Sequence, residues 1–184
     1  MLEIKAAELG EQVNQILIAA RLDNREGAPP SDPVEFDLTA ATRQAVARVE
    51  SRAALAGARI ELVANGAVPV WGSPSEIGVV LDNLLNNALT YSRETPEVRV
   101  EVDGEGPLVR VADRGVGIPA HEQDRVFERF YRVDRPDFAY PPGTGLGLSI
   151  ARRMAEANGA SLELEWSEFD VGSSFVLKLR TEKP

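Results

Sequence analysis

The stretch that decides the fold is residues 113–150, which has a glycine cluster at each end. It opens with Asp113-Arg114-Gly115-Val116-Gly117-Ile118 and closes with Gly143-Thr144-Gly145-Leu146-Gly147-Leu148-Ser149-Ile150. Glycine lets a backbone approach a ligand closely, and consecutive N–H groups at the start of a helix bind anions. The leading carboxylate fits a base edge and the N–H groups fit phosphates, so the two clusters together indicate a nucleotide site. The alternative is a pair of tight turns.

The composition excludes several classes of protein. The chain has 184 residues, of which 43% are hydrophobic, and this suits one domain with an appendage. The net charge of −9 argues against nucleic acid and anionic membrane as partners, because an acidic surface repels phosphate. There is no cysteine and the single histidine is His121, which excludes disulfides, thiol catalysis and clusters of Cys or His around a metal. No apolar run reaches the ~18–20 residues of a membrane span and no signal peptide is present, so we expect a soluble chain.

The first 22 residues have the pattern of a helix that packs on a partner helix. Apolar residues recur every seven positions in two series offset by four, which predicts an a/d seam over three heptads. The two series are Leu2, Leu9, Ile16 and Ala6, Val13, Ala20. The alternative is an ordinary amphipathic helix that docks on its own domain. Residues 23–33 are rich in Gly and Pro and are predicted to be a linker, so the main domain spans 34–184.

The remaining chain predicts a two-layer α/β sandwich. We predict helices over 38–56, 73–91 and 145–158, a short helix over 120–130, and strands over 59–63, 68–71, 97–102, 107–112, 162–166 and 174–179. Ser73, Pro74 and Glu76 form a capping-box start for the helix that follows. Residues 132–142 have no periodicity and are predicted to be a mobile loop. We therefore expect three helices against one sheet of five or more mostly antiparallel strands.

Three asparagines lie within five positions of the helix predicted over 73–91. At 100° per residue Asn83, Asn86, Asn87 and Thr90 fall on one stripe, and apolar residues fill the other side. Asparagine is a poor helix former because its side chain competes for backbone hydrogen bonds, so the stripe indicates a functional face. The alternative is a solvated polar face. An Asn amide oxygen is a suitable ligand for Mg²⁺, which takes few protein groups and keeps phosphates and waters.

Four motifs together resemble the sequence boxes of sensor histidine kinases, in the order and at the spacing of that family. They are the N box at 83–92, the first glycine box at 113–118, the F box at 127–132 and the second glycine box at 143–148. The resemblance covers about residues 34–180. Within the family, the chain is similar to the EnvZ-related class. It implies the Bergerat-type ATP-binding fold, which is shared with large heat-shock chaperones, type II topoisomerases and mismatch-repair ATPases.

The resemblance also implies a role for each matching residue. Asn87 is expected to bind Mg²⁺, with Asn83 nearby on the phosphate side. Asp113 is expected to accept the adenine amino group, and Tyr91 to pack against the base. The other residues expected to contact ATP are Gly115, Gly117, Ile118, Gly143, Thr144, Gly145, Leu146, Gly147 and Leu148.

Two positions depart from the family pattern. The family often has Lys or Arg in contact with phosphate where this chain has Thr90, and this puts some phosphate affinity in doubt. The family usually has Asp where this chain has Ser73, a change that is expected to be structural. The cations expected to help phosphoryl transfer are Arg132 and Arg135, which act with Asn87.

The phosphoacceptor of the family does not match any residue of this chain. In the family the acceptor His lies in a His-Glu or His-Asp motif, whereas His121 follows the first glycine box and is expected to be an ordinary exposed residue. Residues 1–22 resemble the end of the second helix of the dimerisation and phosphoacceptor hairpin.

We therefore expect the ATP-binding catalytic domain of a sensor histidine kinase, which transfers the γ-phosphate of ATP to a His on a separate hairpin. The expected partners are that hairpin, a response regulator and a second copy in the full-length protein. The domain is expected to be cytoplasmic, within a full-length protein in the cell membrane. One alternative is an ATP-hydrolysing member of the same superfamily, although positions 79–89 contain Asp82 and no Glu. The other alternative is a non-enzymatic module that binds nucleotide or only a partner helix.

Overall fold

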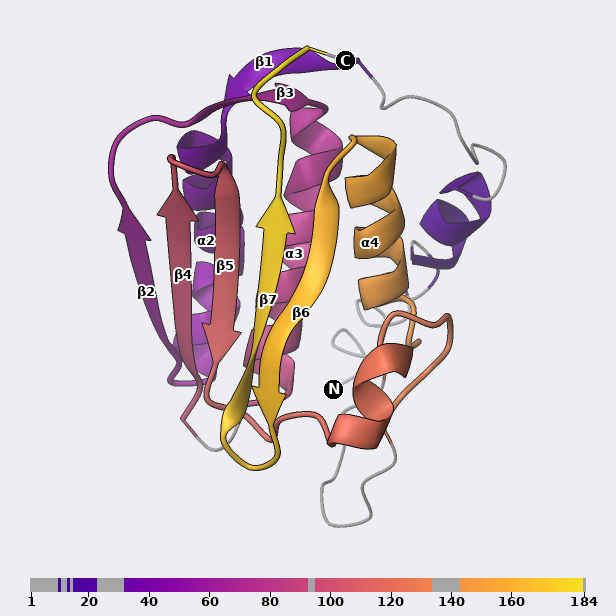
Figure 1. Ribbon diagram of the computed structural model, residues 1–184. Helices are drawn as coiled ribbons and strands as arrows, with labels where there is room; N and C mark the ends of the chain where they lie inside the picture. Colours follow the sequence, from indigo (N-terminus) through magenta and orange to yellow (C-terminus); the bar gives the residue numbers. More distant parts are fainter. Residues whose placement is uncertain are drawn as a thin grey trace.

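The computed structural model describes residues 10, 13, 15–22, 32–92, 95–133 and 143–183. Within these ranges three helices cover one face of a five-stranded sheet (Figure 1). The helices are α2 (Leu38–Leu55), α3 (Pro74–Thr90) and α4 (Gly147–Ala157), and the strands of the sheet are β2 (Arg59–Ala64), β4 (Glu97–Asp103), β5 (Leu108–Asp113), β6 (Ser161–Glu168) and β7 (Gly172–Lys178). This arrangement confirms the predicted two-layer sandwich.

The sheet is mixed, with the strand order β2-β4-β5-β7-β6. Only β2 and β4 run parallel, and the other neighbours in this sheet are antiparallel. The strand predicted over 68–71 does not join this sheet. It forms β3 (Pro69–Gly72) and pairs antiparallel with β1 (Val34–Asp37), which the sequence pattern did not reveal. β1 has only four residues and its partner lies far along the chain, so local alternation did not identify it.

Asp37 connects this small sheet to the helical layer. Its Oδ1 accepts hydrogen bonds from the backbone N–H of Thr39, at 2.9 Å, and from that of Val68, at 3.0 Å. The first bond caps α2, because an Asp before a helix satisfies one of the backbone donors that have no partner inside the helix. The second holds the chain just before β3, so one carboxylate fixes both the start of α2 and the β1–β3 pair.

The core lies between the sheet and α3, the central helix of the layer. The apolar side of α3 is almost inaccessible, and each of its residues is at most 3% exposed: Ile77, Val80, Leu81, Leu84, Leu85 and Ala88. Burying a Val, Leu or Ile side chain contributes about 1.5–3 kcal/mol relative to leaving it exposed. The valines that alternate along β4 and β5 meet this helix from the sheet side. The core therefore fixes how α3 is rotated, and with it the direction of the asparagine stripe.

The start of α3 differs in part from the predicted capping box. The Ser73 Oγ accepts a hydrogen bond from the Glu76 N–H at 3.4 Å, as expected. The Ser73 N–H donates to Asn158 Oδ1 at 2.7 Å, and Asn158 Nδ2 donates to Glu76 Oε2 at 2.8 Å. An asparagine at the end of α4 therefore stands between the two residues of the box, and the contact joins the ends of two helices that are distant in sequence.

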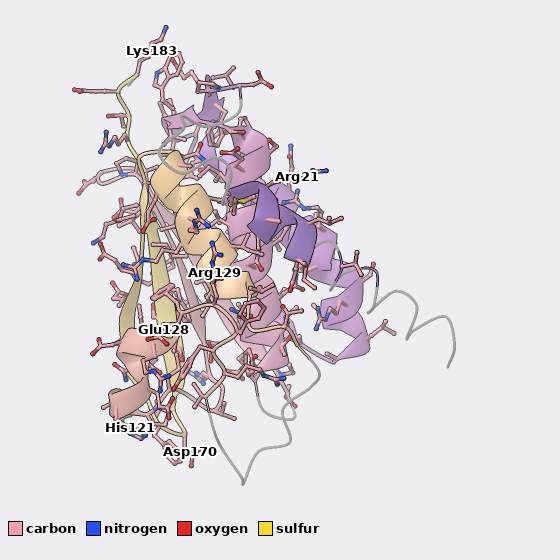
Figure 2. All side chains as sticks on the ribbon, turned by 90° about the vertical axis from the view of Figure 1, so that its right-hand side faces the viewer. Arg21, His121, Glu128, Arg129, Asp170 and Lys183 are labelled. Carbon is pink, nitrogen blue, oxygen red and sulfur yellow. The ribbon has the colours of Figure 1, made fainter. Side chains whose placement is uncertain are left out.

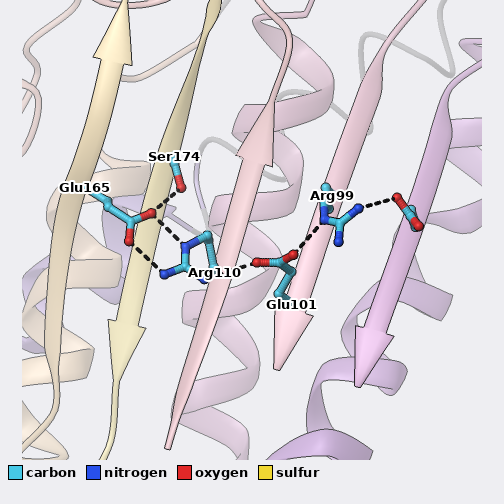
Figure 3. A network of polar contacts seen from close by, with 6 residues as sticks. Arg99, Glu101, Arg110, Glu165 and Ser174 are labelled. Atoms are coloured by element: carbon cyan, nitrogen blue, oxygen red, sulfur yellow. Dashed lines mark hydrogen bonds and ion pairs between the residues drawn. The ribbon is translucent and has the colours of Figure 1, made fainter. Parts of the chain in front are cut away.

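The face of the sheet opposite the helices carries a chain of ion pairs across the strands (Figure 3). Arg110 of β5 donates to Glu165 of β6 at 2.7 Å and to Glu101 of β4 at 3.1 Å, and Glu101 also accepts from Arg99. Hydrogen bonds from the arginines hold the pKa values of Glu101 and Glu165 below their usual range. This polar face explains why β4 and β5 alternate so clearly, since one side of each strand is buried and the other is solvated.

The short helix predicted over 120–130 is correct only in its first half. A 3-10 helix, η1, spans Ala120–Arg125, and the chain then turns. Phe130 has a left-handed backbone with φ of 61°, and its N–H donates to the Gly145 carbonyl at 3.0 Å. This contact between the F box and the second glycine box replaces the second half of the predicted helix.

Residues 15–22 are helical and dock on the main domain by a face that does not include the heptad seam. Leu22 is 6% exposed, Ile18 packs against the core, and the Leu22 carbonyl accepts a hydrogen bond from Arg153 of α4. The seam residues Val13 and Ile16 are 49% and 53% exposed. One side of this helix therefore docks on the protein's own domain, while the heptad seam on another side remains accessible. None of the helices in the described ranges is long and apolar enough to cross a bilayer.

Candidate functional site

The polar stripe of α3 divides into two pairs that face different neighbours. Asn86 and Thr90 face α2, where they accept hydrogen bonds from Arg52 at 2.9 and 3.0 Å. Asn83 faces the start of α4, and its Nδ2 donates to the Val79 carbonyl of its own helix. The stripe is therefore not one uniform surface, and the pair formed by Asn83 and Asn87 lies towards the glycine boxes.

Asn87 differs from the other two asparagines of the stripe. Its side chain is half-buried, and no hydrogen bond in the structure of the described residues involves it. A half-buried amide with no protein partner retains its full capacity to bind a ligand. No group of three or more His, Asp or Glu that could hold a metal occurs in the described part of the chain. The amide oxygen of Asn87 thus suits a cation whose other ligands are phosphate oxygens and waters, as is typical of Mg²⁺.

Asp113 is the carboxylate at the opposite end of the site. It is the last residue of β5 and is 9% exposed, and its Oδ1 accepts the Gly115 N–H at 2.8 Å. Burial raises the pKa of Asp113 to about 6, while the backbone N–H groups of Gly115 and Ser173 act in the opposite direction. No ion pair with a cation occurs among the described residues, so the carboxylate relies on neutral donors. A ligand that donates a hydrogen bond would stabilise its ionised form.

The first glycine box packs against the protein's own backbone. A β-carbon at Gly115 would lie 2.3 Å from the Tyr91 carbonyl, and one at Gly117 would lie 2.0 Å from the Glu168 carbonyl. The Tyr91 carbonyl accepts the Val116 N–H at 3.0 Å. Gly117 also has φ of +64°, which glycine adopts without steric cost. These glycines therefore hold the box against the end of α3 and the β6–β7 turn, so that Asp113 and Tyr91 lie close together.

Ile118, the last residue of the first glycine box, also has protein partners. The Ile118 N–H donates to Ser167 Oγ at 2.8 Å, and the Ile118 carbonyl accepts from Gln123 at 3.0 Å. Its side chain packs against the core. The backbone N–H and carbonyl of Ile118 are therefore engaged by the protein, and only the exposed part of its side chain could contact a ligand.

The second glycine box meets α3 one helical turn before Asn87. A β-carbon at Gly147 would lie 2.8 Å from Asn83 Oδ1, so glycine lets α4 begin close to the N box. The Leu146 N–H donates to Thr144 Oγ1, and no side chain of the described residues caps the N-terminus of α4. The first turn of α4 therefore presents N–H groups and the positive end of the helix dipole beside Asn83.

The other residues of this box have mixed surroundings. The Leu146 side chain is 1% exposed and Leu148 packs against the core, so only their backbone faces the site. Thr144 is hydrogen-bonded to Gln15 of the N-terminal helix. Gly145 has φ of +69° and passes against Phe130, and Gly143 is exposed.

The two predicted catalytic arginines differ in what the structure shows. Arg132 is partly exposed and donates to the Gly143 carbonyl at 3.2 Å, which links the F box to the start of the second glycine box. Arg135 and residues 134–142 of the predicted mobile loop lie outside the described residues.

His121 has the surroundings of an ordinary surface residue. Its side chain is 80% exposed and lies 3.4 Å from Glu122. Figure 2 shows it at the lower end of the molecule near Asp170, away from Arg21 of the N-terminal helix. Exposure agrees with the prediction from the sequence.

Comparison with known proteins identifies the class of domain. A family described as "Histidine kinase-, DNA gyrase B-, and HSP90-like ATPase" matches residues 72–183. The sensor-like histidine kinase SenX3 of Mycolicibacterium smegmatis is 32% identical over 173 residues, which are 93% of this chain and 44% of SenX3. The sensor histidine kinase WalK of Bacillus subtilis is 44% identical over 116 residues, which are 59% of this chain and 18% of WalK. The structure of the mycobacterial sensor histidine kinase MprB matches with a TM-score of 0.70 and 27% identity, over 79% of this chain and 97% of that one.

The chain therefore belongs to the histidine kinase-, DNA gyrase B- and HSP90-like ATPase family, whose domain binds ATP. Within that family its relatives are sensor histidine kinases, so it is a catalytic domain of the histidine kinase type. This confirms the resemblance drawn from the four motifs. The chain spans less than half the length of the relatives SenX3 and WalK.

Arg52 contacts the polar stripe of α3 in a way that the sequence pattern did not reveal. It lies on an exposed face of α2, where an arginine is unremarkable, and it meets the N box only through tertiary packing. The one local signal is its spacing of four residues from Arg48, which also contacts α3.

Proposed function

We propose that this domain binds Mg·ATP along the polar side of α3 and transfers the γ-phosphate to a histidine on a separate hairpin. One observation carries the proposal: both glycine boxes pack on the same helix, the second at Asn83 and the first at Tyr91. Eight residues of α-helix span about 12 Å, which suits a nucleoside triphosphate lying between the two boxes. Asn87 lies between these contacts, with its side chain available.

Each end of this span offers chemistry for one end of ATP. Asp113, together with Tyr91, fits the adenine, because a buried carboxylate can accept a hydrogen bond from the exocyclic amino group. The start of α4 fits the phosphates, because its first-turn N–H groups and helix dipole favour negative charge. Asn87 would hold Mg²⁺ through its amide oxygen, and the bound ion would neutralise charge on the phosphates. Arg132 and Arg135 are the cations that we assign to the transferred group.

The relatives support the remaining parts of the proposal. The structure of full-length ShkA, with a TM-score of 0.75 and 25% identity, is a complex with AMPPNP. The match covers 94% of this chain and 35% of ShkA. The acceptor histidine would therefore lie in a part of the full-length protein that corresponds to the rest of ShkA. We assign residues 1–22 to the dimerisation and phosphoacceptor hairpin, 23–33 to a linker and 34–184 to the catalytic domain. The full-length protein would be a dimer in the cell membrane that passes the phosphoryl group to a response regulator.

ATP hydrolysis as the main activity is less well supported. An attacking water needs a base near the γ-phosphate, and Asp82 is the only carboxylate in residues 79–89. Arg48 Nε lies 3.0 Å from both Asp82 oxygens, so this carboxylate is engaged on the side of α3 that faces α2.

Phosphotransfer to a separate hairpin tests the proposal. The chain is mixed with a histidine-bearing hairpin of a related kinase and with γ-³²P ATP, and acid-labile label is followed over time. We expect label on the hairpin, none on the chain alone, and no effect of His121→Gln. Asn87→Ala should abolish transfer while the protein remains folded by circular dichroism. Label on the isolated chain that His121→Gln removes would show that His121 is the acceptor.

A further inference from the structure

Ser167, near the end of β6, receives the last residue of the first glycine box. Its Oγ accepts the Ile118 N–H at 2.8 Å, and its hydroxyl donates to the Gly172 carbonyl at 3.0 Å. A third partner is the hydroxyl of Ser173, at 2.9 Å. A serine hydroxyl has one hydrogen and two acceptor lone pairs. Because the hydrogen of Ser167 goes to Gly172, Ser173 is the donor between the two hydroxyls, and both lone pairs of Ser167 are used.

The same two serines reach the carboxylate at the other end of the box. The backbone N–H of Ser173 donates to the carboxylate of Asp113, its partner in the pairing of β7 with β5. A chain of hydrogen bonds therefore runs through the two serines, from Asp113 at one end to Ile118 at the other. Ser173 is 5% exposed, and a buried polar group is costly to leave without its partner. The two strands thus hold both ends of the first glycine box.

Gln123 of η1 completes the contact between Ile118 and β6. Its Nε2 donates to the Ile118 carbonyl and to the Ser167 carbonyl, each at 3.0 Å. An amide nitrogen has two N–H donors, and both are used here. Ile118 is thus held to β6 by its own N–H and, through Gln123, by its carbonyl. An ionised carboxylate or an apolar side chain at position 123 could make neither bond.

We propose that Ser167 and Gln123 are positioning residues for the base of the bound nucleotide. This inference rests on the proposed nucleotide site, in which Asp113 accepts the adenine amino group. The protein engages both backbone groups of Ile118, so the exposed part of its side chain is left to border the base. Ser167 and Gln123 set the place of that side chain relative to Asp113. They touch no ligand themselves and act through Ile118.

The variants that test the proposal are Ser167→Ala, Ser167→Thr and Gln123→Leu, with Ser174→Ala as the matched control. Ser174 lies on the same hairpin, but its hydroxyl donates to Glu165 in the ion-pair chain on the opposite face of the sheet (Figure 3). Each variant is titrated calorimetrically with ATP and with adenosine, and its free energy of unfolding is measured in urea. Gln123 is partly exposed in η1, so Gln123→Leu tests the proposal even if Ser167→Ala does not fold.

Ser167→Ala and Gln123→Leu are each expected to weaken ATP and adenosine by the same factor, about threefold to tenfold, because one or two hydrogen bonds to Ile118 are lost. The factors are equal because the two ligands share the base. Ser167→Thr keeps the hydroxyl and should bind both ligands within about twofold of the wild type. Ser174→Ala should lower the stability but change neither affinity by more than about twofold, because its hydroxyl does not hold the first glycine box.

Several results would overturn the assignment. A Ser167→Ala or Gln123→Leu variant that is less stable but binds adenosine as the wild type does would show a purely structural contact. A loss of affinity confined to ATP would mean that the phosphates, and not the base, are affected. Equal losses in Ser174→Ala would show that any weakening of the hairpin has this effect, and a folded Ser167→Thr that does not bind would contradict the role of the hydroxyl. If the wild-type domain binds neither ligand, the proposed function itself fails, and the wild-type titration alone shows this.

Discussion

The ionisation of Asp113 couples the stability of the domain to its affinity for ATP. Burial raises the pKa of this carboxyl from 3.8 to about 6 in the folded protein. A raised pKa means that the folded state disfavours the charged form, so the charge destabilises the fold at every pH at which it is present. Between about pH 4 and pH 6 the folded state binds more protons than the unfolded state, and stability falls as the pH rises.

The substitution Asp113→Asn removes this charge while its amide oxygen still accepts the Gly115 N–H. Above pH 7 the two pKa values correspond to about 3 kcal/mol, the upper limit of the stabilisation expected for the variant without ligand. The same values give about 2 kcal/mol at pH 5 and less than about 1 kcal/mol at pH 4. Urea denaturation of both proteins at these three pH values measures the differences.

ATP binding is expected to change in the opposite direction. The ionised carboxylate is the form that accepts a hydrogen bond from the adenine amino group, and at pH 5 only about a tenth of Asp113 is ionised if the pKa is about 6. The affinity of the wild type for ATP should therefore fall about tenfold between pH 7.5 and pH 5. The Asp113→Asn variant, measured over the same range, is the control, because any change in its affinity reports the titration of ATP itself and is subtracted. At pH 7.5 the variant should bind ATP at least about tenfold more weakly than the wild type, because a hydrogen bond to a charged group is lost. A variant that is less stable than the wild type at pH 7.5, or a wild type whose affinity has the same pH dependence as the variant, would refute the reasoning.

Three further variants test other parts of the structure. Asn87→Ala should weaken Mg·ATP at least about tenfold in calorimetry, while Asn86→Ala should cost less than about threefold, since only the former has an unbonded amide facing the site; equal losses would contradict the metal assignment. Gly147→Ala places a methyl group 2.8 Å from Asn83 Oδ1, and should lower stability by about 1 kcal/mol and weaken ATP but not adenosine; unchanged ATP affinity would remove the start of α4 from the site. Arg110→Ala should cost about 1 kcal/mol in urea denaturation at pH 7, and because its two glutamate partners have lowered pKa values this difference should vanish as the pH falls below their folded pKa values; a difference that persists at pH 2 would mean that packing, and not charge, is responsible.

The elements with strong local periodicity were predictable from the sequence. Helices α2, α3 and α4 and strands β4 and β5 occur within a few residues of their predicted bounds, because apolar spacing, caps and glycines act over short distances along the chain. The end of α4 is an example, since Gly159 has φ of +65° just beyond the last helical residues. The four boxes that line the candidate site were also recognisable, because each box is a continuous segment whose composition departs from what an ordinary helix or turn needs.

The tertiary structure decided the contacts between segments that are far apart in sequence. The pairing of β1 with β3, the parallel pairing of β2 with β4 and the turn at Phe130 depend on partners that no local pattern identifies. The asparagine stripe was visible in the sequence, but its division into a pair bound by Arg52 and a pair facing the glycine boxes was not. A helical pattern gives the angular position of a side chain on its own helix, whereas the identity of the neighbouring helix depends on how the whole core packs.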